Sequence, residues 1–82
     1  MATVGQQVSA HESCLAKYGP YTPYTYQGSF GKYLFRWGTY KYGWAWCLML
    51  NGGREILAFG EVDSESEVRG AANRAAEKLE AK

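Results

Sequence analysis

The hydrophobic pattern in the second half of the chain predicts a β-hairpin. Residues 44–50 are continuously apolar, which is typical of a central strand covered on both faces, or open to a partner on one. Asn51, Gly52 and Gly53 suit a tight turn, because asparagine and glycine tolerate positive φ angles. Residues 55–62 then return as the next strand.

The alternation of side chains along this hairpin assigns them to two faces of a sheet. The first face is expected to carry Trp44, Trp46, Leu48, Leu57 and Phe59. The second face is expected to carry Ala45, Cys47, Met49, Ile56 and Ala58. Because the second face has no charged side chain, it is a candidate surface for self-association into a homodimer.

A helix is predicted after the hairpin. Ser64 and Glu67 have the spacing of a capping box, in which each side chain satisfies a backbone N–H at the helix start. The apolar stripe that follows consists of Val68, Ala71, Ala72, Ala75, Ala76 and Leu79. Since alanines leave voids unless large residues face them, we expect Trp46 and Phe59 to lie in the core beneath this helix.

A shorter helix over residues 10–18 is predicted near the start of the chain, after a flexible arm over residues 1–8. Ser9 and Glu12 form another capping box, and a Gly-Pro pair at 19–20 ends the helix. The buried side of this helix is expected to consist of Cys14, Leu15 and Tyr18.

The middle of the chain predicts further strands. Pro23 interrupts residues 21–27, so this segment is expected to be extended or an edge strand. Residues 32–37 alternate with the period of a strand, and residues 38–43 are expected to form a turn. Together the elements predict one α+β domain over residues 9–82, in which a small antiparallel sheet of three to four strands carries both helices on one face.

Composition narrows the class of protein. A chain of 82 residues forms one modest core, and three Trp, three Phe and seven Tyr are available to fill it. The net charge is +1, but no acidic residue lies between Ser13 and Arg54, whereas acidic residues predominate from Glu55 onward. No stretch approaches the ~20 apolar residues of a membrane span, and residues 1–8 lack the apolar run of a secretory signal. We therefore expect a cytoplasmic protein without a membrane partner.

Candidate catalytic and metal-binding residues are few. Cys14 and Cys47 belong to no CxxC pair, so we expect them to be buried apolar side chains. His11 is the only histidine and has no set of catalytic partners near it in sequence. The carboxylates within residues 61–67 are expected to cap a helix, and the glycines do not have the spacing of a phosphate loop. The sequence thus predicts no enzyme, no metal site and no cofactor.

The remaining candidate site is an aromatic and basic stretch within residues 18–46. Tyrosine gives a large contact area at low entropic cost, which suits a protein interface. Aromatic side chains among cations also suit single-stranded nucleic acid, and a purely structural role on a half-buried sheet is a third interpretation. The predicted partner-binding residues are Tyr21, Tyr24, Tyr26, Lys32, Arg36, Tyr40, Lys41 and Tyr42.

The end of the chain resembles a double-stranded-RNA-binding domain. The likeness is carried by the run from Gly60 to Ser64, by Glu67, Val68, Ala71 and Ala72, and by the order helix, strands, helix. This resemblance implies RNA binding, but that family has consecutive lysines just after the serine, where this chain has Glu65 and Ser66. Because an acidic helix start repels phosphates, the resemblance favours the fold more than the activity.

The chain is also similar to small phage-encoded inhibitors, anti-CRISPR proteins among them. The similarity lies in its size, its tryptophan-containing hairpin, its glycine turn and its capped, alanine-rich helix. It implies a protein that covers a functional face of a host protein or nuclease complex. The sequence therefore predicts a non-enzymatic binding protein with a protein partner, and the alternatives are a nucleic-acid-binding module and a self-associating structural protein.

Overall fold

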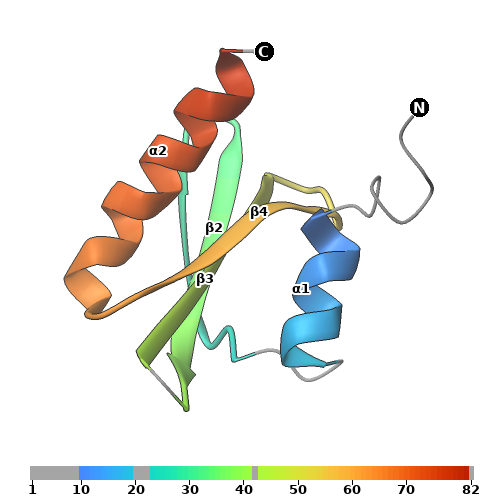
Figure 1. Cartoon of the computed structure of the whole chain (residues 1–82). Helices are drawn as coiled ribbons and strands as arrows, with labels where there is room; N and C mark the ends of the chain where they lie inside the picture. Colours follow the sequence, from blue (N-terminus) through green and yellow to red (C-terminus); the bar gives the residue numbers. More distant parts are fainter. Residues whose placement is uncertain (1–9, 20–22, 42, 82) are drawn as a thin grey trace.

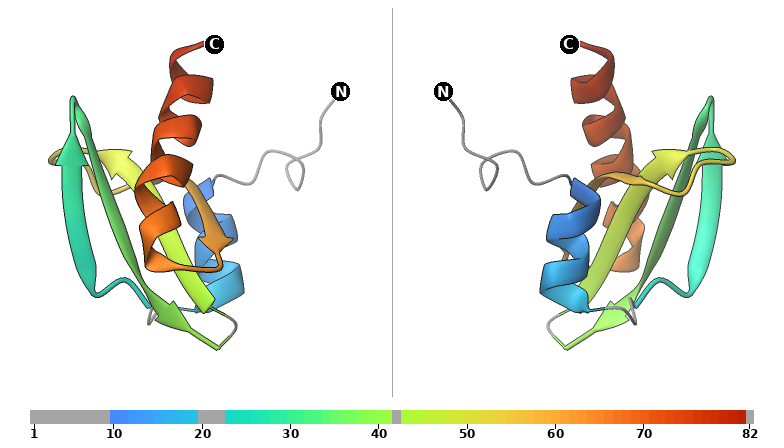
Figure 2. Two further views of the ribbon diagram at one scale, coloured as in Figure 1. Left: turned by 90° about the vertical axis from the view of Figure 1, so that its left-hand side faces the viewer. Right: turned by 90° about the vertical axis from the view of Figure 1, so that its right-hand side faces the viewer.

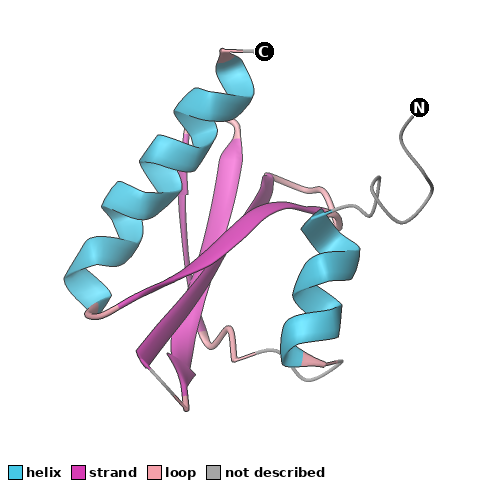
Figure 3. Ribbon diagram, in the orientation of Figure 1, coloured by secondary structure: helices cyan, strands magenta, loops and turns pink. Residues whose placement is uncertain are grey.

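The computed structural model describes residues 10–19, 23–41 and 43–81. The predicted arm over residues 1–8 and the cap at Ser9 lie outside the described residues. The elements are α1 (Ala10–Tyr18), β1 (Tyr26–Phe30), β2 (Tyr33–Tyr40), β3 (Gly43–Leu50), β4 (Ile56–Val62), the short 3₁₀ helix η2 (Glu65–Glu67) and α2 (Val68–Glu80) (Figure 1). Helices at both ends of the described chain enclose the strands, as Figure 3 shows, so the predicted α+β class is confirmed.

The strands form one antiparallel sheet in the order β1-β2-β3-β4, with β1 and β4 at its edges. The edge strand begins at Tyr26, later than the segment 21–27 suggested. Gly38 lies inside β2 and not in the predicted turn over residues 38–43. Its lack of a side chain is required there, because a β-carbon would collide with the carbonyl of Pro23, which crosses β2 at this point.

Helix α2 packs on one face of the sheet, and its predicted capping box is present. The Ser64 N–H donates to Glu67 Oε2 at 3.0 Å. Small residues of α2 pack against large residues of the sheet, as close packing requires. The buried members of this α2 cluster are Tyr33, Phe35, Trp46, Leu48, Val68, Ala71, Ala72 and Ala76. The predicted burial of Trp46 beneath the helix is confirmed, since only 7% of it is exposed.

Helix α1 packs on the opposite face, so the prediction that both helices share one face is wrong. Figure 2 shows β3 between the two helices. The α1 cluster has Cys14, Tyr24, Ala45, Cys47 and Ile56 at its centre, with Tyr18, Tyr40, Met49 and Phe59 packed around them. Leu15, expected on the buried side, is 39% exposed. A helix of nine residues with little amphipathic character does not indicate which sheet face it covers.

A β-bulge in the β3–β4 hairpin changes which side chains share a face. Leu48 pairs with Ala58, but its neighbour Met49 pairs with Ile56. Leu57 is therefore an extra residue in β4, and a single extra residue moves the side chains beyond it to the opposite face relative to β3.

This shift overturns part of the predicted assignment of faces. Phe59 pairs with Cys47 and packs in the α1 cluster, so the prediction that it lies beneath α2 is wrong. Ala58, expected to share the face of Cys47, packs against the α2 cluster instead. Counting residues from the glycine turn fails here because the bulge lies beyond the turn.

Two glycines allow aromatic rings to lie across the edge strands. Gly28 of β1 pairs with Phe35, and Gly60 of β4 pairs with Trp46. A β-carbon at either position would lie 2.9 Å from the opposing ring, which is closer than van der Waals contact allows. Aromatic rings that cover edge glycines in this way stabilise strand pairing, and here both rings also form the floor beneath α2.

Candidate functional site

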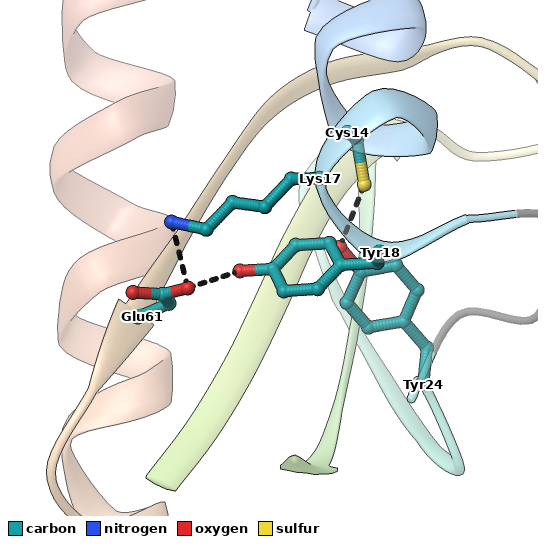
Figure 4. Close-up of polar contacts among 5 residues, drawn as sticks. All are labelled: Cys14, Lys17, Tyr18, Tyr24 and Glu61. Carbon is teal, nitrogen blue, oxygen red and sulfur yellow. Dashed lines mark hydrogen bonds and ion pairs between the residues drawn. The ribbon is translucent and has the colours of Figure 1, made fainter. Parts of the chain in front are cut away.

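A polar cluster joins α1 to the edge strand β4 (Figure 4). Glu61 Oε2 accepts a hydrogen bond from the Tyr18 hydroxyl at 2.7 Å and lies 2.8 Å from Lys17 Nζ. Hydrogen bonds from Lys17, Tyr18 and Tyr40 lower the pKa of Glu61 to about 2. The carboxylate is therefore ionised at neutral pH, and it is poorly suited to act as a general base there.

The ring of Tyr18 is held among other aromatic rings. Its centroid lies 6.3 Å from that of Tyr24, 5.6 Å from Tyr40 and 6.2 Å from Phe59, each in an edge-to-face arrangement. Burial and the Glu61 carboxylate raise the pKa of the Tyr18 hydroxyl above its usual value. The hydroxyl thus stays protonated and donates to Glu61, so this cluster fastens α1 to the sheet.

The two cysteines lie in the same region and are not bonded to each other. Cys14 Sγ is 2.9 Å from the hydroxyl of Tyr24 (Figure 4). Both cysteines are fully buried. Burial raises the pKa of the Cys14 thiol, and it raises the pKa of Cys47 to about 12. Neither thiol ionises at neutral pH to become a nucleophile or a metal ligand. The prediction of buried, apolar cysteines is confirmed.

His11 takes part in holding α1 against the sheet. The backbone N–H of Ile56 donates to His11 Nδ1 at 3.3 Å, next to the bulge of β4. This contact gives the histidine a structural role that the sequence did not indicate. Within residues 10–19, 23–41 and 43–81, no group of three His, Cys, Asp or Glu side chains could hold a metal ion.

Some predicted partner-binding residues face α1 and are engaged within the chain. Tyr24 is 7% exposed, and Tyr40 packs against the α1 cluster. Arg36 pairs with Cys47 on this side, and its Nη2 donates to the Tyr24 carbonyl at 3.1 Å. Arg36 Nε is buried without a hydrogen-bond partner in the part of the chain described. Packing therefore holds this guanidinium against the sheet.

The other predicted residues are dispersed. Lys32 and Lys41 lie in the turns at opposite ends of β2. Lys32 pairs with Glu80 at 3.2 Å. Tyr26 lies on the α2 side of β1, away from Tyr24, because its strand partner is Trp37. Tyr21 and Tyr42 lie outside the described residues. The structure thus does not gather the described members into one surface.

The residues predicted for self-association are covered within the chain. Ala45 and Cys47 are fully buried, and Ile56 is 6% exposed in the α1 cluster. Met49 packs against the same cluster, whereas Ala58 packs against the α2 cluster. The expectation that this face is open is therefore wrong, because α1 occupies it.

An aromatic strip runs over β1 and β2 on the side of α2. Its members are Tyr26, Phe30, Tyr33, Phe35 and Trp37. The Trp37 ring is stacked between its neighbours, 5.8 Å from Tyr26 and 5.1 Å from Phe35. The alternation of side chains along β2 predicts that Tyr33, Phe35 and Trp37 share one face. The row on β1 emerges only from strand pairing, which places Tyr26 opposite Trp37 and Phe30 opposite Tyr33.

The aromatic strip is covered at its centre and open at the Tyr26 end. The Arg69 guanidinium lies over the Phe35 ring, 5.5 Å from its centroid. Trp37 Nε1 donates to Glu65 Oε2 at 2.9 Å. No side chain of the described residues covers Tyr26 in this way, and it is 50% exposed. An exposed ring beside a sheet edge is therefore the most accessible part of the strip.

Comparison with protein-family models, with curated proteins and with solved structures found no match for this chain. Among the described helices, none combines the length and the apolar character that crossing a membrane requires.

Proposed function

We propose that this chain is a non-enzymatic binding protein and that the Tyr26 end of the aromatic strip contacts a protein partner. The observation that carries the proposal is the 50% exposure of Tyr26 while its ring stacks on Trp37. A ring already held by a neighbour loses little conformational entropy when a partner covers it. Tyrosine and tryptophan are also the side chains most enriched at energetic centres of protein interfaces.

The charges around the strip favour a protein partner over nucleic acid. Arg69 is engaged with Phe35, and Lys32 is paired with Glu80. The Glu65 carboxylate accepts a hydrogen bond from Trp37, the ring on which Tyr26 stacks. Among the described residues, the two cations beside the strip already contact a ring or a carboxylate, and a phosphate backbone would also meet the Glu65 carboxylate, whereas a protein surface needs no cation there.

The proposed mode of action is occlusion of a partner's functional face. The size of the chain and its aromatic surface, which it shares with small phage-encoded inhibitors, support this mode. β1 is an edge strand, so its outward backbone N–H and C=O groups can also pair with an extended segment of the partner. A protein that acts in this way requires no catalytic activity.

Capture experiments with matched variants test the proposal. The immobilised chain is exposed to lysate of the organism that carries the gene or of its host, and bound proteins are identified by mass spectrometry. Tyr26→Ala should abolish a specific set of bound proteins. Gln27→Ala is the control, because Gln27 is also exposed but lies on the opposite face of β1. Equal capture by both variants would exclude the Tyr26 end as the contact.

Titration with duplex and single-stranded oligonucleotides tests the alternative. We expect no micromolar binding at either about 50 or about 200 mM salt. Micromolar binding that weakens ~50-fold over that range would instead show phosphate contacts and would replace the protein partner by a nucleic acid.

A further inference from the structure

A groove lies on the other side of α2 from the aromatic strip. β4 and α2 diverge from the connection that joins them (Figure 1), and the space between them is a groove of about 470 Å³. Its apolar floor is formed by Trp46, Leu57, Ala75 and Leu79. Leu57, Ala75 and Leu79 are each partly exposed, so apolar surface is accessible along the groove.

The outer wall of this groove is basic. Arg74 and Lys78 line it, and both side chains are exposed. They lie one turn apart on α2, where two like charges destabilise a helix slightly. The helix dipole accounts for Lys78 in the last turn but not for Arg74 in the middle of the helix.

Within the described residues, no carboxylate forms an ion pair with Arg74 or Lys78. Glu77 and Glu80 line the separate groove beside the β1–β2 turn. Glu61 reaches the end of the basic groove, but its carboxylate is held by Lys17 and Tyr18. Positive charge is therefore concentrated on one wall above an apolar floor.

We propose that this groove binds an acidic amphipathic helix of a partner protein, whose carboxylates contact Arg74 and Lys78 and whose apolar side chains cover Leu57 and Leu79. The α2 residues that line the groove run from Ala71 to Leu79 and give the wall a length of about 14 Å, which matches about two to three turns of a partner helix. The apolar face of an amphipathic helix can cover the floor of the groove while its charged side chains contact the wall. A nucleic acid would leave the apolar floor uncovered.

Fluorescence polarisation with a defined probe tests the proposal. The probe is a labelled peptide of about fourteen residues, with leucine at helical i, i+3 and i+7 spacing and glutamate at the remaining positions. The matched probe carries glutamine in place of every glutamate. The chain should bind the glutamate probe at least about tenfold more tightly than the glutamine probe, because only the former offers carboxylates to the wall.

Variants locate the binding. Arg74→Gln combined with Lys78→Gln should weaken the glutamate probe about tenfold and leave the glutamine probe unchanged. Arg54→Gln is the control, since it removes an exposed cation of the β3–β4 connection and should change neither affinity. Ala75→Met, which fills the floor without changing charge, should weaken both probes. A melting curve for each variant confirms that it is folded.

Amide chemical-shift mapping separates this groove from the aromatic strip. Perturbations should be confined to β4 and the second half of α2, and Tyr26→Ala should not affect them. The proposal is overturned if the glutamate probe does not bind at millimolar concentration, if the Arg74 and Lys78 variants bind as the parent does, or if the shifts lie at Tyr26. Because the Tyr26 contact and the basic groove are tested with separate variants, a negative result for one proposal does not contradict the other.

Discussion

The two faces of the sheet are packed by different means. On the α2 face, large aromatic rings of the sheet pack against alanines of the helix in a buried apolar cluster. On the α1 face, a short helix is held by a carboxylate with its donors, by a thiol beside a hydroxyl and by a histidine that accepts a backbone N–H. The first face depends on volume, and the second depends on hydrogen-bond partners.

This difference indicates how each face should respond to substitution. Removing volume from the α2 face leaves a cavity that the small alanines cannot fill. Removing one polar atom from the α1 face lowers the free energy of unfolding only by the net contribution of its hydrogen bond. The largest effects are therefore expected beneath α2 and the smallest in the exposed polar cluster.

Trp46→Ala should have the largest effect. Trp46 is 7% exposed beneath α2, so the cavity should lower the free energy of unfolding by about 3 to 5 kcal/mol, enough to unfold a domain of this size. Thermal and urea denaturation measure it. Leu50→Ala is the control, because Leu50 is 43% exposed and should cost under about 1 kcal/mol. A Trp46 variant that melts at the parent temperature would contradict this account of the α2 face.

Gly60→Ala should destabilise the protein by about 1 to 3 kcal/mol through overpacking, because the new methyl group would lie 2.9 Å from the Trp46 ring. Gly70→Ala is a control of opposite sign. Gly70 lies within α2, with only the flexible end of Arg74 nearby, so alanine there should stabilise the helix by about 0.5 to 1 kcal/mol. Urea denaturation compares the two, and equal effects would show that ring contact at Gly60 is unimportant.

Tyr24→Phe should cost about 1 kcal/mol, because it removes the hydroxyl that lies against Cys14 in the buried α1 cluster. The same substitution on the other face provides the comparison. Tyr33→Phe removes a donor to Glu80, which is largely exposed, and should cost under about 0.5 kcal/mol. Chemical denaturation of both variants is the measurement, and a reversed order would mean that the thiol contact does not stabilise α1.

The contribution of Glu61 should depend on pH. Its pKa is about 2 in the folded chain and about 4.3 when unfolded, so its stabilising effect is complete above about pH 4.3 and is lost as the pH falls towards 2. The stability difference between the parent and Glu61→Gln should shrink over that interval. Glu55→Gln, which removes an exposed carboxylate of the β3–β4 connection, is the control. Matching pH profiles for the two variants would contradict a fastening role for Glu61.

Much of the fold could be predicted because the patterns that specify it lie within single elements. The capping box at Ser64, the alanine stripe and the apolar run of β3 are of this kind, and they predict that Trp46 is buried beneath α2. The extra residue Leu57 is different, because its place depends on how β4 meets β3. No property of Leu57 itself marks a bulge, and the face of Phe59 was therefore assigned wrongly.

The candidate site was harder to predict than the fold. Tyrosines that are close in sequence, such as Tyr24 and Tyr26, lie on different faces of the sheet. Conversely, the aromatic strip and the basic groove each join residues from separate elements. Such surfaces depend on strand order and helix placement, and α1 had too little amphipathic character to reveal its own placement.

Both thiols are buried between α1 and the sheet, so their reactivity reports on the motions of that helix. A buried thiol with a raised pKa reacts with an alkylating reagent only when the structure opens around it. The rate at which Cys14 and Cys47 become labelled therefore measures how often α1 lifts from the sheet. If α1 detaches by itself, labelling will be faster than global unfolding allows. If it opens only with the whole domain, the two rates will coincide.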